Sequence, residues 1–377
     1  MQIAIQVSYL DRCLELAELG RGRTSPNPMV GAVVVRDGEV VAEGYHSAYG
    51  ERHAEYAALA VAGYRARGST LYCNLEPCCF RSPGKHQPPC TDAIIAAGVE
   101  KVVIGQRDPN PKVDGGGIRL LRAAGIEVEL LDDETHWRFN NRFNTLQVLK
   151  RPFVQLKAAF SLDGRIAAAG GDSRWISDEA ARYRAHCFRG EADAVAVGIG
   201  TLLADDPLLT NRSGIGGSPR AVVFDSLLRT PLDSQLLRKR ADELILLCSE
   251  DADPDRRRRL EAEGATLIGL KLRDGRLDPG ESLQRLKEQG IVSLMVEGGS
   301  ALLSSFLQSG AWDRLDAVLA PILLGRGVDF LGEIGVGSMD EALGFEEVRW
   351  EQLGRQQLFQ GYRRGWLEEV RGVHRID

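Results

Sequence analysis

The sequence lacks the features of a membrane protein or a nucleic-acid-binding protein. No apolar run approaches the length that spans a bilayer. The first ten residues show no basic segment followed by an apolar stretch and a cleavage site, so we expect no signal peptide. Basic residues are not in excess either, because the formal net charge is −6, whereas nucleic-acid binders are commonly basic. We therefore expect a small-molecule partner, with no nucleic acid and no membrane.

Cysteine is scarce and occurs in an odd number. The chain has seven cysteines, and three of them, Cys78, Cys79 and Cys90, gather in one short segment. Secreted proteins use cysteine for a disulfide framework, whereas free and metal-binding cysteines are typical of a reducing compartment. We therefore predict a cytoplasmic protein without a disulfide framework.

The chain is too long for a single hydrophobic core. It has 377 residues, of which 44% are hydrophobic and 27% charged, the balance of an ordinary globular protein. Between Asp132 and Pro152 the pattern changes to a polar stretch dotted with aromatic residues. We place the domain boundary there and predict two domains, residues 1–148 and residues 149–377.

Strands and helices alternate in the first domain. Valine-rich runs on both sides of Asp37-Gly38 predict a β-hairpin, because Asp-Gly favours a tight turn between antiparallel strands. This order of elements predicts an α/β layer with helices on both faces of a sheet. The predicted strands are 30–35, 40–45, 70–75, 101–105 and 126–130, and the predicted helices are 7–19, 53–62, 91–97 and 118–124.

The second domain has the same α/β character, and its last predicted strand, 291–296, ends in Glu297-Gly298-Gly299-Ser300. A strand, two glycines and a helix N-terminus form a natural cradle for an anion, although two glycines also make a plain turn. Glu297 is the more specific signal, because a buried carboxylate is costly without a partner. The other predicted strands are 153–160, 194–198, 221–225, 244–248 and 265–268, and the helices are 178–188, 201–204, 254–262, 280–288 and 301–307.

The segment from residue 53 to residue 90 carries the side chains of a catalytic zinc site. His53, Cys78 and Cys90 supply one imidazole and two thiolates, and Glu55 follows the histidine closely. Zinc held by three protein ligands keeps a fourth tetrahedral position open for water, and it lowers the pKa of that water to roughly 7. A carboxylate that does not bind the metal can then move protons between the water and a leaving amine. This pattern is the signature of zinc-dependent deaminases, so we predict three zinc ligands and Glu55 as the catalytic proton shuttle.

A closed structural zinc site is the alternative interpretation. Such sites usually use cysteines at a C-x₂₋₄-C spacing, whereas Cys78 and Cys79 are adjacent. Adjacent cysteines rarely bind the same metal ion well, so we assign Cys78 as the ligand and Cys79 as a neighbour. Cys73 lies in a strand-like apolar run, where a small buried side chain is the better interpretation.

Asn27 lies in the rigid loop Thr24-Ser25-Pro26-Asn27-Pro28, just before the first predicted strand. Its position makes it a candidate contact for a substrate heterocycle. Asparagine is also a common turn residue, and the residues alone favour the turn.

Taken together, the motifs resemble one family, the bifunctional deaminase–reductase of riboflavin biosynthesis. The resemblance covers nearly the whole chain, and the combination and order of its motifs are highly specific. They are Ser25-Pro26-Asn27-Pro28-Met29-Val30-Gly31, His53-Ala54-Glu55, Leu75-Glu76-Pro77-Cys78, Pro88-Pro89-Cys90-Thr91-Asp92-Ala93, Asp108-Pro109-Asn110-Pro111, Ser161-Leu162-Asp163-Gly164, Ser173-Arg174-Trp175-Ile176, Thr201-Leu202-Leu203-Ala204-Asp205-Asp206-Pro207 and Val296-Glu297-Gly298-Gly299.

The resemblance implies a fold and two consecutive reactions. The first domain would have the three-layer α/β fold of cytidine deaminases, and the second would be similar to dihydrofolate reductase. The zinc domain would remove an amino group from 2,5-diamino-6-(ribosylamino)-4(3H)-pyrimidinone 5′-phosphate, and the second domain would reduce the ribosyl chain to ribityl with NADPH. The fold analogy also implies a homodimer.

The resemblance carries over site residues of three kinds. It implies the same zinc ligands and the same proton shuttle as the residue pattern. The residues implied to contact substrate are Asn27, Lys85, Ser173, Arg189, Leu209, Arg212 and Glu297; the arginines suit a sugar phosphate because a guanidinium can bind it with two hydrogen bonds. The residues implied to contact NADPH are Phe160, Trp175, Thr201, Asp205, Ser226, Gly299, Ser300, Ala301, Leu302, Leu303, Ser304 and Ser305.

Three departures from the family pattern stand out. The loop between the cysteine ligands, residues 79–89, is longer than in the family, and Cys79-Phe80 stands where the family has Ser-His. Gly116 stands where the family tends to carry a basic residue, and Phe160 is larger than the residue common at its position. The first two concern the phosphate pocket of the deaminase, which Lys85 would reach from a displaced position. They would also fit a paralogue that acts on a modified pyrimidine.

Two further hypotheses explain parts of the sequence. A nucleic-acid base deaminase would share His53, Glu55 and Pro77-Cys78, but the C-x-x-C spacing usual in that class is missing and the net charge is unfavourable. A zinc-stabilised, non-catalytic scaffold would explain the longer loop. The presence of both Glu55 and Glu297 argues against the scaffold, because such residues are kept for function.

Overall fold

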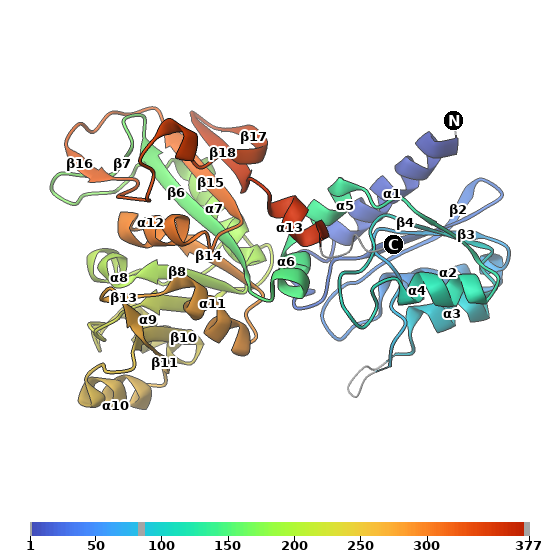
Figure 1. The fold of residues 1–377 in the computed structure, drawn as a ribbon, viewed down its shortest axis with the longest axis horizontal. Helices are drawn as coiled ribbons and strands as arrows, with labels where there is room; N and C mark the ends of the chain where they lie inside the picture. Colours follow the sequence, from blue (N-terminus) through green and yellow to red (C-terminus); the bar gives the residue numbers. More distant parts are fainter. Residues whose placement is uncertain (1, 82–86, 373–377) are drawn as a thin grey trace. The chain divides into compact units, whose positions relative to one another are not determined.

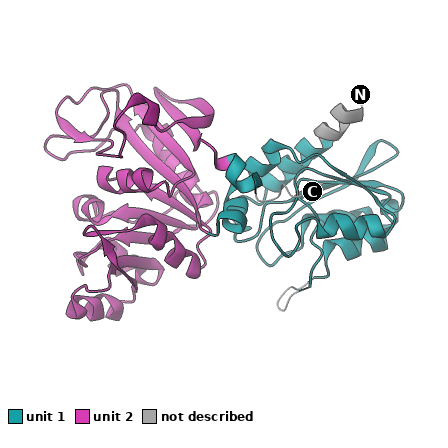
Figure 2. Ribbon diagram, viewed as in Figure 1, with its two compact units in different colours: residues 1–150, 367–377 teal, residues 151–366 magenta. Residues whose placement is uncertain are grey.

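The structure is a computed structural model that describes residues 2–81 and 87–372. The chain divides into two units, Met1–Lys150 together with Leu367–Asp377, and Arg151–Trp366 (Figure 2). The C-terminal segment contacts the first unit, where Arg371 of helix α13 (Trp366–Gly372) donates a hydrogen bond of 3.1 Å to the carbonyl oxygen of Asp132. In the described ranges, no helix combines the length and the apolar character needed to cross a membrane.

Unit 1 is built on a five-stranded sheet with the strand order β2-β1-β3-β4-β5. Strand β1 pairs antiparallel with β2 and β3, whereas β3, β4 and β5 are parallel to one another. Its strands are β1 (Gly31–Arg36), β2 (Glu39–Tyr45), β3 (Thr70–Cys73), β4 (Lys101–Ile104) and β5 (Glu127–Leu130), and its helices are α1 (Gln2–Glu18), α2 (Ala54–Ala62), the 3₁₀-helix η1 (Gly63–Ala66), α3 (Cys90–Ala97), α4 (Gly116–Ala123), α5 (Glu134–Phe139) and α6 (Asn141–Leu149).

Helices cover both faces of this sheet (Figure 1). Because side chains alternate along a strand, Val33 and Val35 of β1 pack with Leu10 of α1 on one face. Ala32 and Val34 face the other way and join the cluster that contains residues of α2, α3 and α4. The unit is therefore the predicted three-layer α/β structure.

Unit 2 contains a nine-stranded sheet in the order β11-β10-β9-β8-β14-β6-β15-β18-β17. The strands from β11 to β15 in this order are parallel, and β18 and β17 continue the sheet antiparallel. The strands are β6 (Phe153–Ser161), β8 (Ala194–Gly198), β9 (Arg220–Phe224), β10 (Leu244–Ser249), β11 (Thr266–Leu270), β14 (Ser293–Glu297), β15 (Arg314–Ala320), β17 (Phe345–Leu353) and β18 (Gln356–Arg363). Two small two-stranded sheets pair β7 (Arg165–Ala168) with β16 (Gly327–Asp329) and β12 (Leu272–Arg273) with β13 (Arg276–Leu277).

The large sheet of unit 2 is also covered on both faces. One core cluster joins β14 and its neighbours to helices α11 and α12, and the other joins the opposite face to α7, α8, α9 and α10. The helices are α7 (Glu179–Glu191), α8 (Ile199–Asp205), α9 (Gln235–Arg240), α10 (Pro254–Ala262), α11 (Pro279–Glu288) and α12 (Ser300–Ser309), and two 3₁₀-helices are η2 (Ala241–Glu243) and η3 (Met339–Glu341). The carboxyl ends of the parallel strands meet at one edge, which is where ligands bind in open α/β sheets.

Candidate active sites

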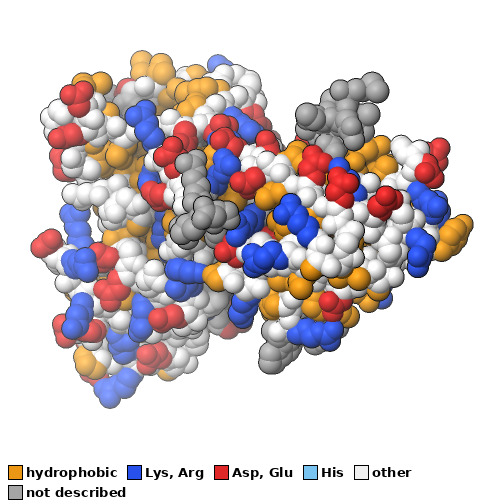
Figure 3. All heavy atoms as spheres, turned by 45° about the vertical axis from the view of Figure 1, so that its right-hand side comes forward, with side chains coloured by type: hydrophobic (Ala, Val, Ile, Leu, Met, Phe, Trp, Pro, Cys, Tyr) orange, Lys and Arg blue, Asp and Glu red, His pale blue; other side chains and the backbone are white. Residues whose placement is uncertain are grey.

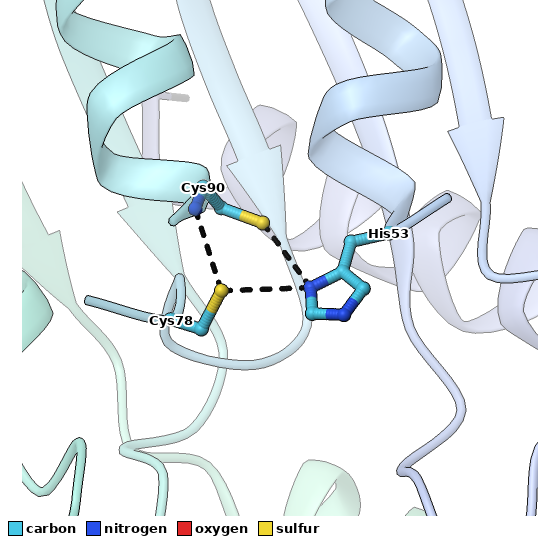
Figure 4. Close-up of side chains that lie close together, drawn as sticks. All are labelled: His53, Cys78 and Cys90. Carbon is cyan, nitrogen blue, oxygen red and sulfur yellow. Dashed lines mark hydrogen bonds between the residues drawn. The ribbon is translucent and has the colours of Figure 1, made fainter. Parts of the chain in front are cut away.

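In unit 1 the structure brings together the three predicted zinc ligands (Figure 4). Nδ1 of His53 lies 3.5 Å from Sγ of Cys78 and 3.3 Å from Sγ of Cys90. His53 stands at the N-cap of α2 and Cys90 is the first residue of α3, so two helix starts and the loop after β3 converge on one point. The ligand atoms all lie within 4.8 Å of one another, and Cys79 is not one of them.

These distances fit a tetrahedral zinc ion. Bonds of about 2.0 Å to nitrogen and 2.3 Å to sulfur at the tetrahedral angle separate the two ligand atoms by about 3.5 Å. The observed separations between nitrogen and sulfur are 3.5 and 3.3 Å. The donor set of one imidazole and two thiolates is also one that zinc prefers, so the residues fit the metal.

The cluster borders a cavity of about 400 Å³, a volume typical of small-molecule sites. Glu55 lines this cavity beside His53 and Cys78, and only 3% of its surface is exposed. Burial raises the pKa of the Glu55 carboxyl, and the nearby Cys78 adds to the shift. The cavity leaves room on the open side of the cluster for water and a heterocycle.

Glu76 lines the cavity and holds the segment before and at the start of α4 through hydrogen bonds to its backbone. Its buried carboxylate accepts from the N–H groups of Asp108 at 3.2 Å, Gly115 at 3.0 Å and Ile118 at 3.1 Å. The side chain of Asp108 also lines the cavity, and burial raises the pKa of its carboxyl well above the ordinary range. Glu76 therefore ties the loop before α4 to the strand that leads to Cys78.

Asn27 lines the same cavity and is held by a histidine. Its side-chain nitrogen lies 3.1 Å from Nε2 of His46, and Nδ1 of His46 lies 3.0 Å from the carbonyl oxygen of Arg52. Because that carbonyl only accepts, Nδ1 carries the proton and Nε2 accepts from the Asn27 amide. Burial lowers the pKa of His46, as expected of a neutral ring. The Asn27 amide oxygen is thus left to face a ligand.

Two of the departures from the family pattern meet in space. A Cβ added at Gly116 would lie 2.9 Å from Sγ of Cys79. Phe80 lines the cavity, and Nζ of Lys112 lies 5.7 Å from the centre of its ring. Lys85, the predicted phosphate contact, lies outside the described residues.

In unit 2 Arg189 and Glu297 form a doubly hydrogen-bonded ion pair. Nε and Nη2 of Arg189 donate to the two carboxylate oxygens at 2.7 and 2.6 Å. Lys157 of β6 is the register partner of Glu297 on β14. Burial alone would raise the pKa of Glu297, but the positive charges of Arg189 and Lys157 outweigh this effect and lower the pKa to about 2. The carboxylate is therefore charged. Two predicted substrate contacts therefore lie together, with a half-buried lysine beside them.

Two other predicted substrate contacts of unit 2, Leu209 and Arg212, stand close in sequence to Thr210, which binds the ion pair. Nη1 of Arg189 donates to the carbonyl oxygen of Thr210 at 3.0 Å, between the buried Leu209 and the exposed Arg212. Arg212 donates through Nε to Nε2 of His186 at 3.2 Å. Ser173 is half-buried on the segment between β7 and α7, and among the described residues no hydrogen bond links it to the ion pair.

Several predicted cofactor contacts lie at or just after the carboxyl ends of parallel strands, namely Phe160 on β6, Thr201 after β8, Ser226 after β9 and Gly299 after β14. Oγ1 of Thr201, at the start of α8, would lie 3.3 Å from a Cβ added at Gly298 or Gly299. Both glycines have a positive φ, 72° and 47°, a conformation that other residues rarely adopt. The glycine turn thus lies against α8, and the backbone can approach a phosphate closely.

The remaining predicted cofactor contacts differ in how open they are. Phe160 stacks on Phe330 with ring centres 4.4 Å apart, which gives its large ring a packing partner. Trp175 is 70% exposed and lies 4.6 Å from the Arg182 guanidinium. The side chain of Leu303 is in the core, so only its backbone could meet a ligand. Of the others, the exposed residues are Asp205 and Ala301, and the half-buried ones are Ser226, Ser300, Leu302 and Ser305. Ser304 is buried, and its hydroxyl oxygen accepts a hydrogen bond of 2.8 Å from the N–H of Gly332.

The sequence interpretation missed three residues that the structure brings into the sites: His46, Lys157 and His186. Lys157 carries a weak signal, because it is the one charged residue in the otherwise uncharged run 153–160. His46 and His186 give no such signal, since their partners come from other segments of the chain.

Comparison with protein families covers both units. The cytidine and deoxycytidylate deaminase zinc-binding region matches residues 4–106, and the RibD C-terminal domain matches residues 152–359. The second match covers more than half of the chain. The predicted fold, a cytidine-deaminase-like three-layer α/β domain followed by a dihydrofolate-reductase-like domain, is thereby confirmed, and the second part is a RibD reductase domain.

Similar proteins match nearly the full length. The riboflavin biosynthesis protein RibD of Aquifex aeolicus is 39% identical over 353 residues, which are 93% of this chain and 96% of that protein. The structure of Acinetobacter baumannii RibD superposes with a TM-score of 0.85 at 32% identity, covering 96% of this chain and 100% of that one. A diaminohydroxyphosphoribosylaminopyrimidine deaminase/5-amino-6-(5-phosphoribosylamino)uracil reductase from Thermotoga maritima gives a TM-score of 0.81 at 35% identity, with 96% and 100% coverage. The chain therefore belongs to the RibD family, the zinc-dependent deaminases and NADPH-dependent reductases of riboflavin biosynthesis.

Proposed function

We propose that the substrate of unit 1 is 2,5-diamino-6-(ribosylamino)-4(3H)-pyrimidinone 5′-phosphate and that unit 2 reduces the deaminated product. The predicted domains, residues 1–148 and 149–377, would carry these two steps. The observation that carries the proposal is the His53, Cys78 and Cys90 cluster, open to a cavity that Glu55 lines. A structural zinc site would be closed by a fourth protein ligand, and the described residues offer three.

In unit 1 the residues divide the work between binding and proton transfer. His53, Cys78 and Cys90 would hold zinc, which when bound supplies the Lewis acid that makes water nucleophilic at neutral pH. Glu55 takes a proton from the water and delivers it to the leaving amine, because it lines the cavity next to two of the ligands. Asn27, oriented by His46, accepts a hydrogen bond from the heterocycle. Lys85 supplies charge for the phosphate.

In unit 2 the glycine turn and α8 receive the cofactor. NADPH supplies the hydride for the ribosyl chain. Glu297, fixed by Arg189, accepts hydrogen bonds from the sugar hydroxyl groups, and Lys157 donates to the sugar oxygen next to the reduced carbon. Arg212 binds the phosphate, with Ser173 and the backbone around Leu209 completing the site.

The cell compartment, the assembly and the class of partner also belong to this proposal. The enzyme acts in the cytoplasm as a homodimer on a small molecule and not on a nucleic acid. In support, acidic and basic side chains are interspersed on the face that Figure 3 shows, and the chain as a whole carries a net charge of −6. Sedimentation of the purified chain tests the homodimer, and a filter-binding assay with tRNA tests the absence of nucleic-acid binding.

One assay on the purified full chain tests the proposed reactions. With the pyrimidine phosphate and NADPH we expect ammonia release and NADPH oxidation, with zinc near one per chain. Removal of zinc by a chelator should abolish ammonia release and leave the reduction of added 5-amino-6-(5-phosphoribosylamino)uracil intact. Ammonia release after complete zinc removal, or no NADPH oxidation with that compound, would contradict the proposal.

A further inference from the structure

Two neighbouring groups define the protonation of His186. Nδ1 of its ring lies 3.2 Å from the carbonyl oxygen of Thr210, and Nε2 lies 3.2 Å from Nε of Arg212. A carbonyl oxygen only accepts a hydrogen bond, and an arginine nitrogen only donates one. The ring therefore carries its proton on Nδ1 and accepts at Nε2, which makes it neutral. Each of its nitrogens is occupied by one partner.

The carbonyl oxygen of Thr210 joins His186 to the catalytic ion pair. The same oxygen accepts from Nη1 of Arg189 at 3.0 Å, and Arg189 is in turn bound by Glu297. The contacts thus form one continuous series of hydrogen bonds from Glu297 through Arg189 and Thr210 to His186 and Arg212. Arg212 stands at its exposed end.

The two arginines in this series of hydrogen bonds, Arg189 and Arg212, differ in how far their charge is compensated. The charge of Arg189 is compensated by Glu297 at 2.6 Å. Among the described residues, by contrast, no carboxylate lies within ion-pair distance of Arg212, which donates a hydrogen bond to the neutral His186. Its two Nη groups are therefore available to an anion. The positive charge available to bind a phosphate is therefore that of Arg212 and not that of Arg189.

The loop that carries Arg212 supports its own backbone. The Asn211 amide donates to the carbonyl oxygens of Ile215 at 2.6 Å and Gly217 at 3.2 Å, and Ser213 N donates to Asn211 Oδ1 at 2.9 Å. None of these bonds fixes the Arg212 side chain. Its direction depends on His186, which comes from helix α7.

We propose that His186 is a positioning residue that holds the Arg212 guanidinium in place to bind the phosphate group of the sugar-phosphate substrate. This inference rests on the proposed contact between Arg212 and that phosphate. A flexible arginine loses rotamer freedom when it binds, and a partner that fixes it in advance removes part of that cost. His186 therefore acts on substrate affinity and not on the chemical step.

The test is the binding of ribose 5-phosphate to the full zinc-loaded chain, measured by calorimetry. His186→Leu should raise the Kd about tenfold, because an arginine that is no longer held in advance must be immobilised when the phosphate binds. His186→Gln, which keeps one donor and one acceptor, should stay within about threefold of the wild type. In the enzyme assay, His186→Leu should raise KM and leave kcat unchanged. Tyr183→Leu, on the exposed side of the same helix, is the matched control and should leave the Kd unchanged.

A double variant separates positioning from a direct contact. If His186 acts through Arg212, the pair His186→Leu/Arg212→Leu should bind ribose 5-phosphate no more weakly than Arg212→Leu alone. Effects of the two substitutions that multiply in the double variant would overturn the inference, as would wild-type affinity in His186→Leu. If Arg212→Leu itself kept wild-type affinity, the proposed phosphate contact would also be wrong. Because both residues belong to unit 2, denaturant unfolding of that unit in each variant reports that it has folded.

Discussion

The sulfur of Cys79 lies against Gly116, so close that a Cβ added at the glycine would be 2.9 Å from it. These two positions are separate departures from the family pattern, and in the fold they are neighbours. The thiol occupies the volume in which a side chain at position 116 would begin. Any side chain at position 116 would therefore require the thiol of Cys79 to move.

We expect Gly116→Ala to lower the free energy of unfolding of unit 1 by about 1–2 kcal/mol, because the added methyl group is forced against the sulfur. In a Cys79→Ala background the same substitution should cost less than about 0.5 kcal/mol, since the sulfur is gone. Calorimetric unfolding of the zinc-loaded chain measures both values. Equal costs in the two backgrounds would show that the contact with Cys79 does not limit position 116.

The zinc cluster was predictable from the sequence because each ligand carries a local signal. His53 comes with Glu55, Cys78 follows a proline, and Cys90 begins a helix. The chemistry of the metal then restricts which of these side chains can act together. The structure brings together the same three side chains that the sequence predicts as ligands.

The reductase site was less predictable, because its contacts depend on strand order. Lys157 lies beside Glu297 only because β6 pairs with β14, and the sequence does not reveal this pairing. The segment 345–353 was missed as a strand for another reason: it forms the exposed edge of the sheet and lacks a continuous apolar run. The assignment of most of α13 to unit 1 was also not predictable, because Arg371 bonds to Asp132, which lies far away in the sequence.

The ion pair between Glu297 and Arg189 should make the stability of unit 2 depend on pH in the acid range. Burial raises the pKa of Glu297, but Arg189 and Lys157 lower it from an ordinary value of 4.5 to about 2. A lowered pKa in the folded state means that the stabilisation is complete above pH 4.5 and is lost as the pH falls toward 2. We expect Glu297→Gln to cost roughly 3 kcal/mol at pH 7, and this difference should shrink below pH 4.5.

Denaturant unfolding at pH 7 and pH 3.5 measures the effect of Glu297→Gln. Glu351→Gln is the matched control, because Glu351 also pairs with an arginine, Arg184 at 2.9 Å, but both side chains are well exposed. Its cost should stay below about 1 kcal/mol at either pH, as is usual for surface pairs. A cost of Glu297→Gln that does not depend on pH would rule out the lowered pKa as its cause.

His46 should contribute to substrate affinity in unit 1 by orienting Asn27. Replacing it with leucine removes the acceptor for the Asn27 amide, which can then turn its nitrogen toward the heterocycle. We expect His46→Leu to raise the KM of deamination about tenfold, the effect of losing one well-formed hydrogen bond to the substrate. Zinc content should remain that of the wild type, because the described cluster does not include His46.

Tyr49→Phe is the control for His46→Leu, since Tyr49 lines the same cavity but is 64% exposed. It should change the KM less than about twofold. If Asn27→Ala and His46→Leu change the KM by different factors, or if their effects multiply in the double variant, His46 does not act through Asn27.

Glu55 is the side chain whose removal should separate metal binding from deamination. Glu55→Gln keeps the shape of the side chain but cannot take up a proton, so we expect deamination to fall by at least about 10²-fold. Zinc should remain near one per chain, because the three ligand atoms come from His53, Cys78 and Cys90. NADPH-dependent reduction of the deaminated compound should be unchanged, since the residues of that site belong to unit 2.

Glu51→Gln is the matched control for Glu55→Gln, because Glu51 lines the same cavity four residues earlier but is exposed. It should retain nearly full deamination activity, because an exposed carboxylate is not placed to carry protons between the metal-bound water and the leaving amine. Ammonia release by Glu55→Gln at the wild-type rate would disprove the proton shuttle. Loss of zinc from that variant would instead mean that Glu55 supports the ligands, and the catalytic role would then have to be tested with Glu55→Ala reloaded with zinc.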